Sequence, residues 1–322
     1  MKCTLGTYTK RSSQGIYQLD LSETQNELTL IAHVDNPTYL TTHKDAIYTV
    51  IKEQDQGGLA VVINGEVVAK HTEVGAPPCY VHYDVDRSLI YTSNYHGGFV
   101  NVYTYQPELG LKLLEKIQYN QGSKAHFVAP NPNTKEIVVC DLGLDQIHTY
   151  TIGSDRKFNL KHTFDAELKQ GPRHIAFHPT LPVLYAFMEL SAQLLVLVDK
   201  GDHYQLIQTL STLPLGQDAI RSGAAIRISS DGRFVYTSNR GHDSISVFQL
   251  DQSGQATMIQ NISSQGKHPR DFNLSLDEKY LLVANMETDN LALFARNSEN
   301  GQLTLIRSDI EAFEVVNIEF NE

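Results

Sequence analysis

The chain has 322 residues, of which 41% are hydrophobic, and a formal net charge of −11 at pH 7. This composition supplies a large core, and the negative balance argues against nucleic acid or an anionic membrane as the main partner, because both select clustered positive charge. We expect a soluble protein with no nucleic-acid partner and no membrane partner.

The N-terminal segment predicts three strands, because each run is alternating or continuously apolar: Cys3–Thr9, Gly15–Leu21 and Glu27–Val34. The first residues lack the apolar core of a signal peptide. No run in the chain approaches the roughly 18 apolar residues that a membrane helix needs. We expect a cytoplasmic protein.

From about Pro37 onward the chain repeats itself. Each copy reads as an apolar strand, a polar turn such as SSDGR or SLDEK, a second apolar strand such as FVYTSN or YLLVAN, and a third strand. One apolar residue of the second strand anchors each copy, and these anchors recur every 43 to 51 residues: Tyr48, Tyr91, Val138, Tyr185, Tyr236 and Leu282. That period is typical of four-stranded propeller blades.

The six copies follow one another without a linker. In the first, Val61–Val68 carries Asn64-Gly65 between alternating apolar residues, which is a strong signal for a type I′ hairpin. The others run from about Pro78 to Leu114, Ala125 to His162, Gly171 to Thr209, Ala224 to Ile262, and Pro269 to Ile306. Before the fifth copy, Ser211–Ser222 reads as a long polar loop, either a functional lid or a tolerated insertion.

The fourth copy shows how the repeat places side chains. It predicts three successive strands, at Arg173–His178, Val183–Phe187 and Leu194–Val198. A short turn joins the first two strands, so the start of the first lies beside the end of the second. Arg173 and Glu189 are therefore expected to share one rim.

The two chain ends complete the architecture. A closed propeller leaves no bare sheet edge, and one blade is commonly built from both termini. The C-terminal run Val315–Phe320 is predicted to supply the inner strand of a blade whose outer strands come from the N-terminus. The predicted fold is all-β, a single seven-bladed β-propeller domain over residues 1–322, with six full blades and one shared blade.

Residues at one repeat position occupy one ring around the central channel. Twelve residues before the anchors lie Cys79, His126, Arg173, Ala224 and Arg270, and four residues after them lie Tyr95, Leu142, Glu189, Arg240 and Met286. Both rings are predicted to lie at the same face. Small or apolar side chains usually fill such positions, so one histidine, three arginines and one glutamate indicate a pocket for a small anionic substrate.

These residues also have structural explanations. Arg173 could brace neighbouring blades through an ion pair with Glu189, and His126 could be a satisfied core histidine. An unpaired Glu189 would be costly, so pairing with an arginine is expected whatever its role. The combination favours function, because a carboxylate and a histidine near several arginines supply a base, an acid and anion-binding forks. Either Glu189 or His126 could be the general base.

Other motifs are weaker. Asn and Asp recur three residues after the anchors, where they could bind a divalent cation but more often cap strand ends. The three cysteines, Cys3, Cys79 and Cys140, are an odd number without C-x-x-C spacing, which indicates neither a disulfide framework nor a zinc site. There is no nucleophile elbow, P-loop or dinucleotide fingerprint. We expect no metal and no organic cofactor.

Long segments of the chain resemble the seven-bladed lactonase propellers, the family of bacterial 6-phosphogluconolactonases and fungal 3-carboxy-cis,cis-muconate lactonizing enzymes. They are LGTYT, AHFVAPNP, DLGLDQI, GPRHIAFHP, AIRISSDGRFVYTSNRGHDSI and HPRDFNLSLDEKYLLVAN, in this order along nearly the whole chain. The resemblance implies a catalytic set consisting of His126, Arg173, Glu189 and Arg240. We expect substrate contacts from four further residues, Arg270, His174, Asn239 and His268.

The resemblance implies hydrolysis of a sugar-acid lactone, above all 6-phospho-D-glucono-1,5-lactone to 6-phosphogluconate in the pentose phosphate pathway. We expect a small anionic substrate and a monomer or weak homo-oligomer. One alternative is cycloisomerisation of a muconate by the same base and acid. Another is a non-catalytic propeller that serves as an interaction platform, whose rim should carry exposed aromatic anchors. A metal-dependent gluconolactonase is a third, and it would lose activity in EDTA.

Overall fold

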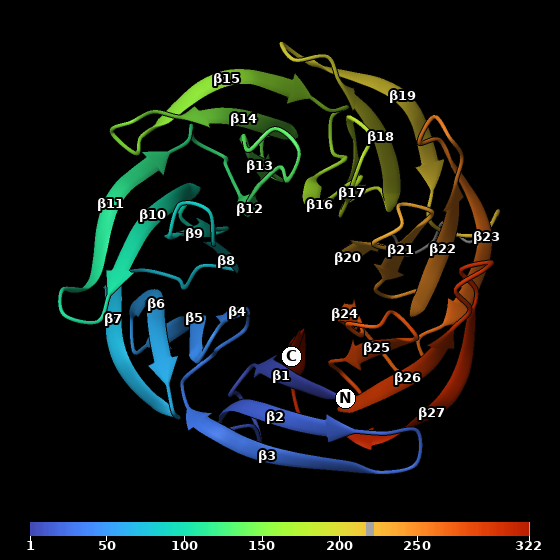
Figure 1. The fold of residues 1–322 in the computed structure, drawn as a ribbon, viewed down its shortest axis with the longest axis horizontal. Coiled ribbons are helices and arrows are strands. Elements are labelled where there is room, and N and C mark those ends of the chain that lie inside the picture. The colour runs from blue at the N-terminus through green and yellow to red at the C-terminus, as the bar shows by residue number, and fades with distance from the viewer. Residues whose placement is uncertain (217–221, 322) are drawn as a thin grey trace.

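The structure is a computed structural model that describes residues 1–216 and 222–321. In this part of the chain, 28 strands form seven antiparallel sheets of four strands, arranged around a central axis like the blades of a propeller (Figure 1). The predicted all-β, seven-bladed fold is confirmed. These residues contain no helix long and apolar enough to span a membrane.

Each blade is a meander whose first strand lies nearest the axis and whose last strand lies at the periphery (Figure 1). Blade one holds β4 (Leu40–His43), β5 (Ala46–Glu53), β6 (Gln56–Ile63) and β7 (Glu66–Val74). Blade two holds β8 (Tyr80–Asp84), β9 (Leu89–Asn94), β10 (Phe99–Gln106) and β11 (Gly110–Gln118). Blade three holds β12 (Ala125–Pro130), β13 (Ile137–Asp141), β14 (Gln146–Ile152) and β15 (Phe158–Asp165).

The next three blades repeat this order. Blade four holds β16 (Pro172–Phe177), β17 (Val183–Met188), β18 (Gln193–Asp199) and β19 (Tyr204–Ser211). Blade five holds β20 (Gly223–Ile228), β21 (Phe234–Asn239), β22 (Ser244–Leu250) and β23 (Ala256–Ser263). Blade six holds β24 (Pro269–Leu274), β25 (Tyr280–Asn285), β26 (Asn290–Arg296) and β27 (Leu303–Glu311).

The seventh blade is built from both chain ends. Its inner strand is the C-terminal β28 (Val315–Asn321), followed outward by β1 (Lys2–Thr7), β2 (Gly15–Leu21) and β3 (Asn26–His33). Strands β28 and β1 pair antiparallel, with Lys2 opposite Asn321 and Gly6 opposite Asn317. The predicted closure by strands from both termini is confirmed, and it removes the two sheet edges that an open ring would expose.

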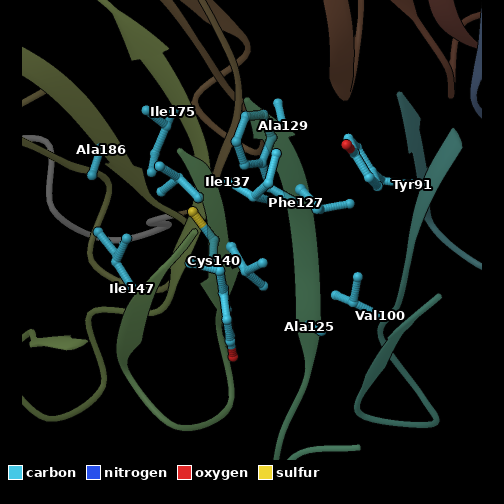
Figure 2. Packing of buried hydrophobic residues seen from close by; sticks show 14 of the residues in the cluster. Tyr91, Val100, Ala125, Phe127, Ala129, Ile137, Cys140, Ile147, Ile175 and Ala186 are labelled. Carbon is cyan, nitrogen blue, oxygen red and sulfur yellow. The ribbon is translucent and has the colours of Figure 1, made fainter. Parts of the chain in front are cut away.

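The core lies between neighbouring blades. All six anchor residues sit on the second strand of their blade, and each is at most 4% exposed. Figure 2 shows how side chains of blades two, three and four meet, among them Val100, Ile137 and Ile175. Because both faces of each sheet pack on another blade, the strands read as continuous apolar runs and show little polar alternation.

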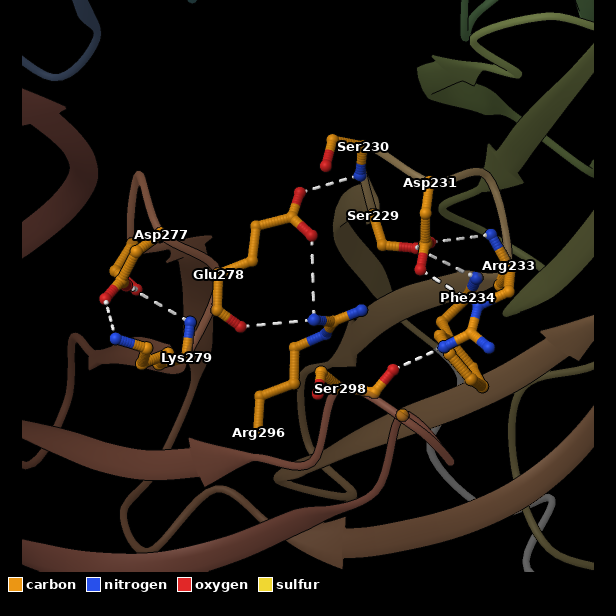
Figure 3. Close-up of polar contacts among 12 residues, drawn as sticks. Ser229, Ser230, Asp231, Arg233, Phe234, Asp277, Glu278, Lys279, Arg296 and Ser298 are labelled. Atoms are coloured by element: carbon orange, nitrogen blue, oxygen red, sulfur yellow. Dashed lines mark hydrogen bonds and ion pairs between the residues drawn. The ribbon is translucent and has the colours of Figure 1, made fainter.

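The polar turns of the repeat have a defined structure. In blade five, the Ser229 hydroxyl donates to Asp231 Oδ1 at 2.6 Å and accepts the N–H of Phe234 at 3.0 Å. The same pattern recurs in blade six with Ser275, Asp277 and Tyr280. The turns also join the two blades, since the Ser230 N–H donates to Glu278 Oε1 at 2.6 Å (Figure 3).

The hairpin predicted in blade one is present. Asn64 and Gly65 separate β6 from β7, and their φ angles are 50° and 82°. A type I′ turn requires both central residues in this left-handed region, which asparagine and glycine tolerate best. The prediction of the turn and of its type is confirmed.

The loop predicted at Ser211–Ser222 joins blades four and five. Strand β19 ends at Ser211 and β20 begins at Gly223. Residues 217–221 of the predicted loop lie outside the described residues, so its function as a lid stays a prediction.

Candidate active site

A β-bulge marks the start of the inner strand in blades three, four and six. In β12, Ala125 lies opposite Asp141 and Phe127 opposite Cys140, which leaves His126 as the extra residue. The same register shift leaves Arg173 extra in β16 and Arg270 extra in β24. A bulge interrupts the alternation of side chains between the two faces of a strand, and so it can re-aim one side chain. Three of the predicted ring residues are therefore bulge residues.

These bulges surround a cavity of about 690 Å³ at one mouth of the channel. Six of the predicted ring residues line it: Cys79, Tyr95, His126, Glu189, Arg240 and Arg270. Arg173 is only 3% exposed and supports the cavity through Glu189. The volume lies within the usual range for a small-molecule site. The expectation that both rings meet at one face is confirmed for these residues.

Glu189 holds two arginines at the floor of the cavity. Its Oε2 atom lies 2.9 Å from Nε of Arg173 and 2.9 Å from Nη2 of Arg240. The Nη groups of the two arginines also donate to the carbonyls of Ala224 at 2.6 Å and Gly223 at 2.5 Å. The prediction that Arg173 and Glu189 share a rim is confirmed.

The charges of this cluster follow from its burial. Burial by itself would raise the pKa of Glu189, but Arg173, Arg240 and Arg270 outweigh it and lower the pKa. Burial, followed by the neighbouring Arg240, lowers the pKa of Arg173 to about 10. At neutral pH the carboxylate is ionised and this arginine is protonated. Nε of Arg240 is buried without a hydrogen-bond partner in the described structure and remains an available donor.

His126 faces the same cavity in its neutral form. It is 4% exposed, and its buried Nδ1 atom has no hydrogen-bond partner among the described residues. Burial, and then the positive charges of Arg173, Arg270 and Arg240, hold its pKa well below 6.5. A neutral imidazole has a nitrogen lone pair that can accept a proton, so this site combines a proton acceptor with fixed cationic groups.

Three predicted substrate contacts lie outside the cavity lining. His174 is 3% exposed, packs edge-on against Tyr80 and lines a separate cavity at the other end of the channel. It follows the bulge at Arg173, so its side chain leaves the strand on another side. Asn239 is fully buried and bonds Thr212, with Thr212 Oγ1 donating to Asn239 Oδ1 at 2.6 Å. The structure therefore gives these two residues packing and hydrogen-bonding positions outside the cavity lining, although the ring of His174 lies 5.1 Å from that of His126.

The third of these residues, His268, lies beside the cavity. Its Nδ1 atom is 3.2 Å from Glu287 Oε1, and its backbone N–H donates to Asp243 Oδ1 at 2.9 Å. Burial, followed by Arg240 and Arg270, lowers the pKa of its imidazole. It pairs with Glu287 and is not part of the cavity lining.

Two of the Asn and Asp residues after the anchors, Asn94 and Asp141, accept hydrogen bonds from the backbone of the following turn, as the sequence favoured. Oδ1 of Asp141, for example, accepts the N–H groups of Lys124, Gly143 and Leu144 at 2.9 to 3.1 Å. In residues 1–216 and 222–321, no three His, Cys, Asp or Glu side chains form a group suited to a metal ion.

Sequence reasoning found six of the residues that line the cavity and missed the others, among them Tyr8, Lys10, Asn36 and Lys52. The repeat spacing could have found two of them, because Asn36 lies twelve residues before the first anchor and Lys52 four residues after it. Tyr8 and Lys10 belong to the shared blade, which has no anchor in the repeat, so no spacing points to them.

Comparison with known proteins identifies the family. The family described as "Lactonase, 7-bladed beta-propeller" matches residues 2–320. A 6-phosphogluconolactonase of Bacillus subtilis is 34% identical over 98% of this chain and 97% of its own. The crystal structure of a Lactobacillus plantarum protein superposes with a TM-score of 0.95 at 35% identity, covering 100% and 99% of the two chains.

A second solved structure has a more specific description. The periplasmic gluconolactonase of Pseudomonas aeruginosa superposes with a TM-score of 0.90 at 26% identity, covering 99% of this chain and 98% of that one. Because the family match spans nearly the whole sequence, and because the seven blades and their closure agree with it, this chain belongs to the lactonase family of seven-bladed β-propellers.

Proposed function

We propose that this protein hydrolyses 6-phospho-D-glucono-1,5-lactone to 6-phosphogluconate. The observation that carries the proposal is the neutral His126, whose buried Nδ1 atom has no hydrogen-bond partner among the described residues, in the cavity whose floor holds Glu189 and its two arginines. The lining has four cationic side chains, Lys10, Lys52, Arg240 and Arg270, against two carboxylates, Asp55 and Glu189. A phosphorylated lactone matches this excess, and the similarity to the Bacillus subtilis 6-phosphogluconolactonase supports the same choice.

The proposed reaction uses only groups of the chain and water. A water molecule attacks the lactone carbonyl carbon while His126 accepts its proton, and the guanidinium of Arg240 stabilises the tetrahedral oxyanion. The bond to the ring oxygen then breaks, and the imidazolium returns the proton to that oxygen, which leaves a hydroxyl and a carboxylic acid that ionises. Glu189 is the weaker candidate for the base, because its carboxylate is already engaged in ion pairs with Arg173 and Arg240.

A panel of lactones tests the proposal and the role of Arg270. We expect the wild type to have a higher kcat/KM on the phosphorylated lactone than on glucono-1,5-lactone, with or without EDTA, and no activity on muconate lactones. Arg270→Lys should lower the preference for the phosphorylated substrate about tenfold, because lysine cannot reproduce the bidentate fork that arginine offers a phosphate. The measurement is kcat/KM for both lactones, corrected for spontaneous hydrolysis.

The outcomes separate the candidate functions. Equal losses on both lactones in Arg270→Lys would mean that this residue does not read the phosphate. A wild type that prefers glucono-1,5-lactone would favour the activity of the Pseudomonas relative, and turnover of muconate lactones alone would favour a cycloisomerase. A purified protein without any of these activities would overturn the proposal in favour of an interaction platform.

The pH dependence of the reaction should follow His126. Because burial and three arginines hold its pKa well below 6.5, the imidazole is already neutral throughout the neutral range. With glucono-1,5-lactone, which carries no titrating phosphate, the corrected kcat/KM should be constant from about pH 6.5 to 8 and fall only at lower pH, where His126 becomes protonated. If the profile of kcat/KM has an inflection between pH 6.5 and 7, the base is not a buried histidine whose pKa is lowered by neighbouring arginines.

A further inference from the structure

The loop between β1 and β2 borders the cavity at the seam where the ring closes. We call residues 8–14 the closing strap. Two of its side chains, Tyr8 and Lys10, line the cavity. Nζ of Lys10 lies 4.1 Å from the centroid of the Tyr8 ring, and the guanidinium carbon of Arg270 lies 5.9 Å from the same centroid. One aromatic ring therefore brings together two cations from different blades.

These cations differ from those at the floor of the cavity. Arg173 and Arg240 are both paired with Glu189. Lys10, Lys52 and Arg270 have no ion pair with any carboxylate in the part of the chain that the structure describes. Neighbouring positive charges repel one another, and a bound anion with several oxygen acceptors relieves that repulsion. Blades six, seven and one thus present three cations that have no ion-pair partner among the described residues, together with Asp55 of blade one, opposite the floor residues of blades three to five.

The buried carboxylate of Glu314 accepts hydrogen bonds from four backbone N–H groups of the closing strap. Oε1 of Glu314 accepts the backbone N–H of Lys10 at 3.1 Å, and Oε2 accepts those of Arg11, Ser12 and Ser13 at 2.9, 3.1 and 3.2 Å. Burial by itself would raise the pKa of Glu314, but these backbone donors outweigh it and lower the pKa. The side chain is ionised at neutral pH, and four successive residues are held by its charge.

The backbone conformation of Glu314 and two contacts with Asp289 also hold the closing strap in place. Glu314 has a φ of 57°, a left-handed conformation that is uncommon outside glycine, asparagine and aspartate. Its own N–H donates to Asp289 Oδ1 at 2.8 Å, and the Arg11 guanidinium binds both oxygens of Asp289 at 2.8 and 3.0 Å. The strap is thereby tied both to the start of β28 and to blade six, which carries Arg270.

We propose that Lys10, Lys52 and Arg270 form a separate phosphoryl-binding end of the cavity, and that Glu314 is a positioning residue that holds Lys10 in it. This inference rests on the proposed function for the identity of the substrate. The ligand expected at this end of the cavity is a phosphoryl group, a tetrahedral dianion, attached to a polyhydroxy acid. The lactone group of the substrate then lies at His126 and Arg240, and its phosphoryl group reaches the closing strap.

The first test measures binding without catalysis. Calorimetric titrations with 6-phosphogluconate and with gluconate are compared for the wild type, Lys10→Gln, Lys52→Gln and the double variant. Each lysine replacement should reduce the preference for the phosphorylated probe about three- to tenfold, and the double variant about 10- to 100-fold. Lys112→Gln, which changes an exposed lysine on β11 away from the cavity, is the matched control for net charge.

The second test asks whether Glu314 acts through Lys10. Glu314→Gln should raise KM for the phosphorylated lactone more than it changes kcat. In a Lys10→Gln background the same replacement should cause no further loss of phosphate preference, because residues that act as one unit are not additive. A purely structural role would give additive losses and equal effects on both probes. If Glu314→Gln does not fold, the two lysine variants decide the proposal.

The outcomes keep this inference distinct from the proposed function. Equal losses on both probes in the double lysine variant, or no loss, would overturn the phosphoryl-binding end even in an active lactonase. A protein that hydrolyses none of the lactones but still prefers 6-phosphogluconate, in a manner that depends on Lys10 and Lys52, would retain it and reject the proposed reaction.

Discussion

Replacing His126 by asparagine should lower kcat on the phosphorylated lactone about 10²- to 10⁴-fold, the range usually lost with a general base. Asparagine retains a polar side chain of similar shape but cannot accept a proton from water near neutral pH. The measurement is kcat after subtraction of spontaneous hydrolysis, with the Tm of the variant as a check on folding. Binding of 6-phosphogluconate should be reduced much less than kcat.

Glu189→Gln is the informative comparison. It keeps the size of the side chain but removes the charge that holds Arg173 and Arg240, so it should lower both Tm and kcat. If Glu189 acts only by holding the two arginines, the pH profile of kcat in Glu189→Gln should have the same shape as in the wild type, with lower values throughout. If kcat collapses in Glu189→Gln while His126→Asn retains it, Glu189 is the base, and if neither variant changes kcat the site is elsewhere.

Deleting residues 315–322 should destabilise the whole ring. This removes the inner strand of the shared blade, with four apolar side chains that are at most 9% exposed: Val315, Val316, Ile318 and Phe320. Burying each contributes about 1.5–3 kcal/mol. Together they approach the total stability of an ordinary domain, about 5–15 kcal/mol. We expect the truncated chain to be insoluble, or to melt at least about 10 °C below the full-length protein.

A peptide of residues 313–322 provides the control for this deletion. Added in excess, it should raise the Tm of the truncated protein, because a ligand that binds only the folded state stabilises it by mass action. A scrambled peptide of the same composition should not. Should the truncated protein keep the Tm of the full chain, the shared blade would contribute little to closure.

Much of the fold could be read from the repeat. The anchors Tyr48 to Leu282 are predicted by their spacing, because every blade must bury the same strand between two neighbours. The closure of the ring was also predictable, since β28 is an apolar run without a partner in its own part of the chain and β1 would otherwise be an open edge.

The candidate site was only partly predictable. The repeat register places Arg173 beside Glu189 and in the same ring as His126 and Arg270, and the structure agrees. The repeat register in the sequence does not reveal the β-bulges that change the direction of these side chains. Each bulge depends on how the inner strand pairs with the second strand of its blade. His174, the residue after a bulge, was expected to contact the substrate and instead lines a second cavity.

The sequence by itself determined the number of blades, their order and the ring in which the charged residues lie, because these follow from a repeat that each blade satisfies locally. Only the tertiary structure decided which of those residues meet. The pairing of Arg240 with Glu189 and the grip of Glu314 on the closing strap join segments from different blades, and Glu314 lies 301 to 304 residues from the backbone groups that it binds. The contacts of Glu314 exist only once the ring has closed, since closure brings the two ends of the chain together. The pairing of Arg240 with Glu189 requires that blades four and five have packed side by side.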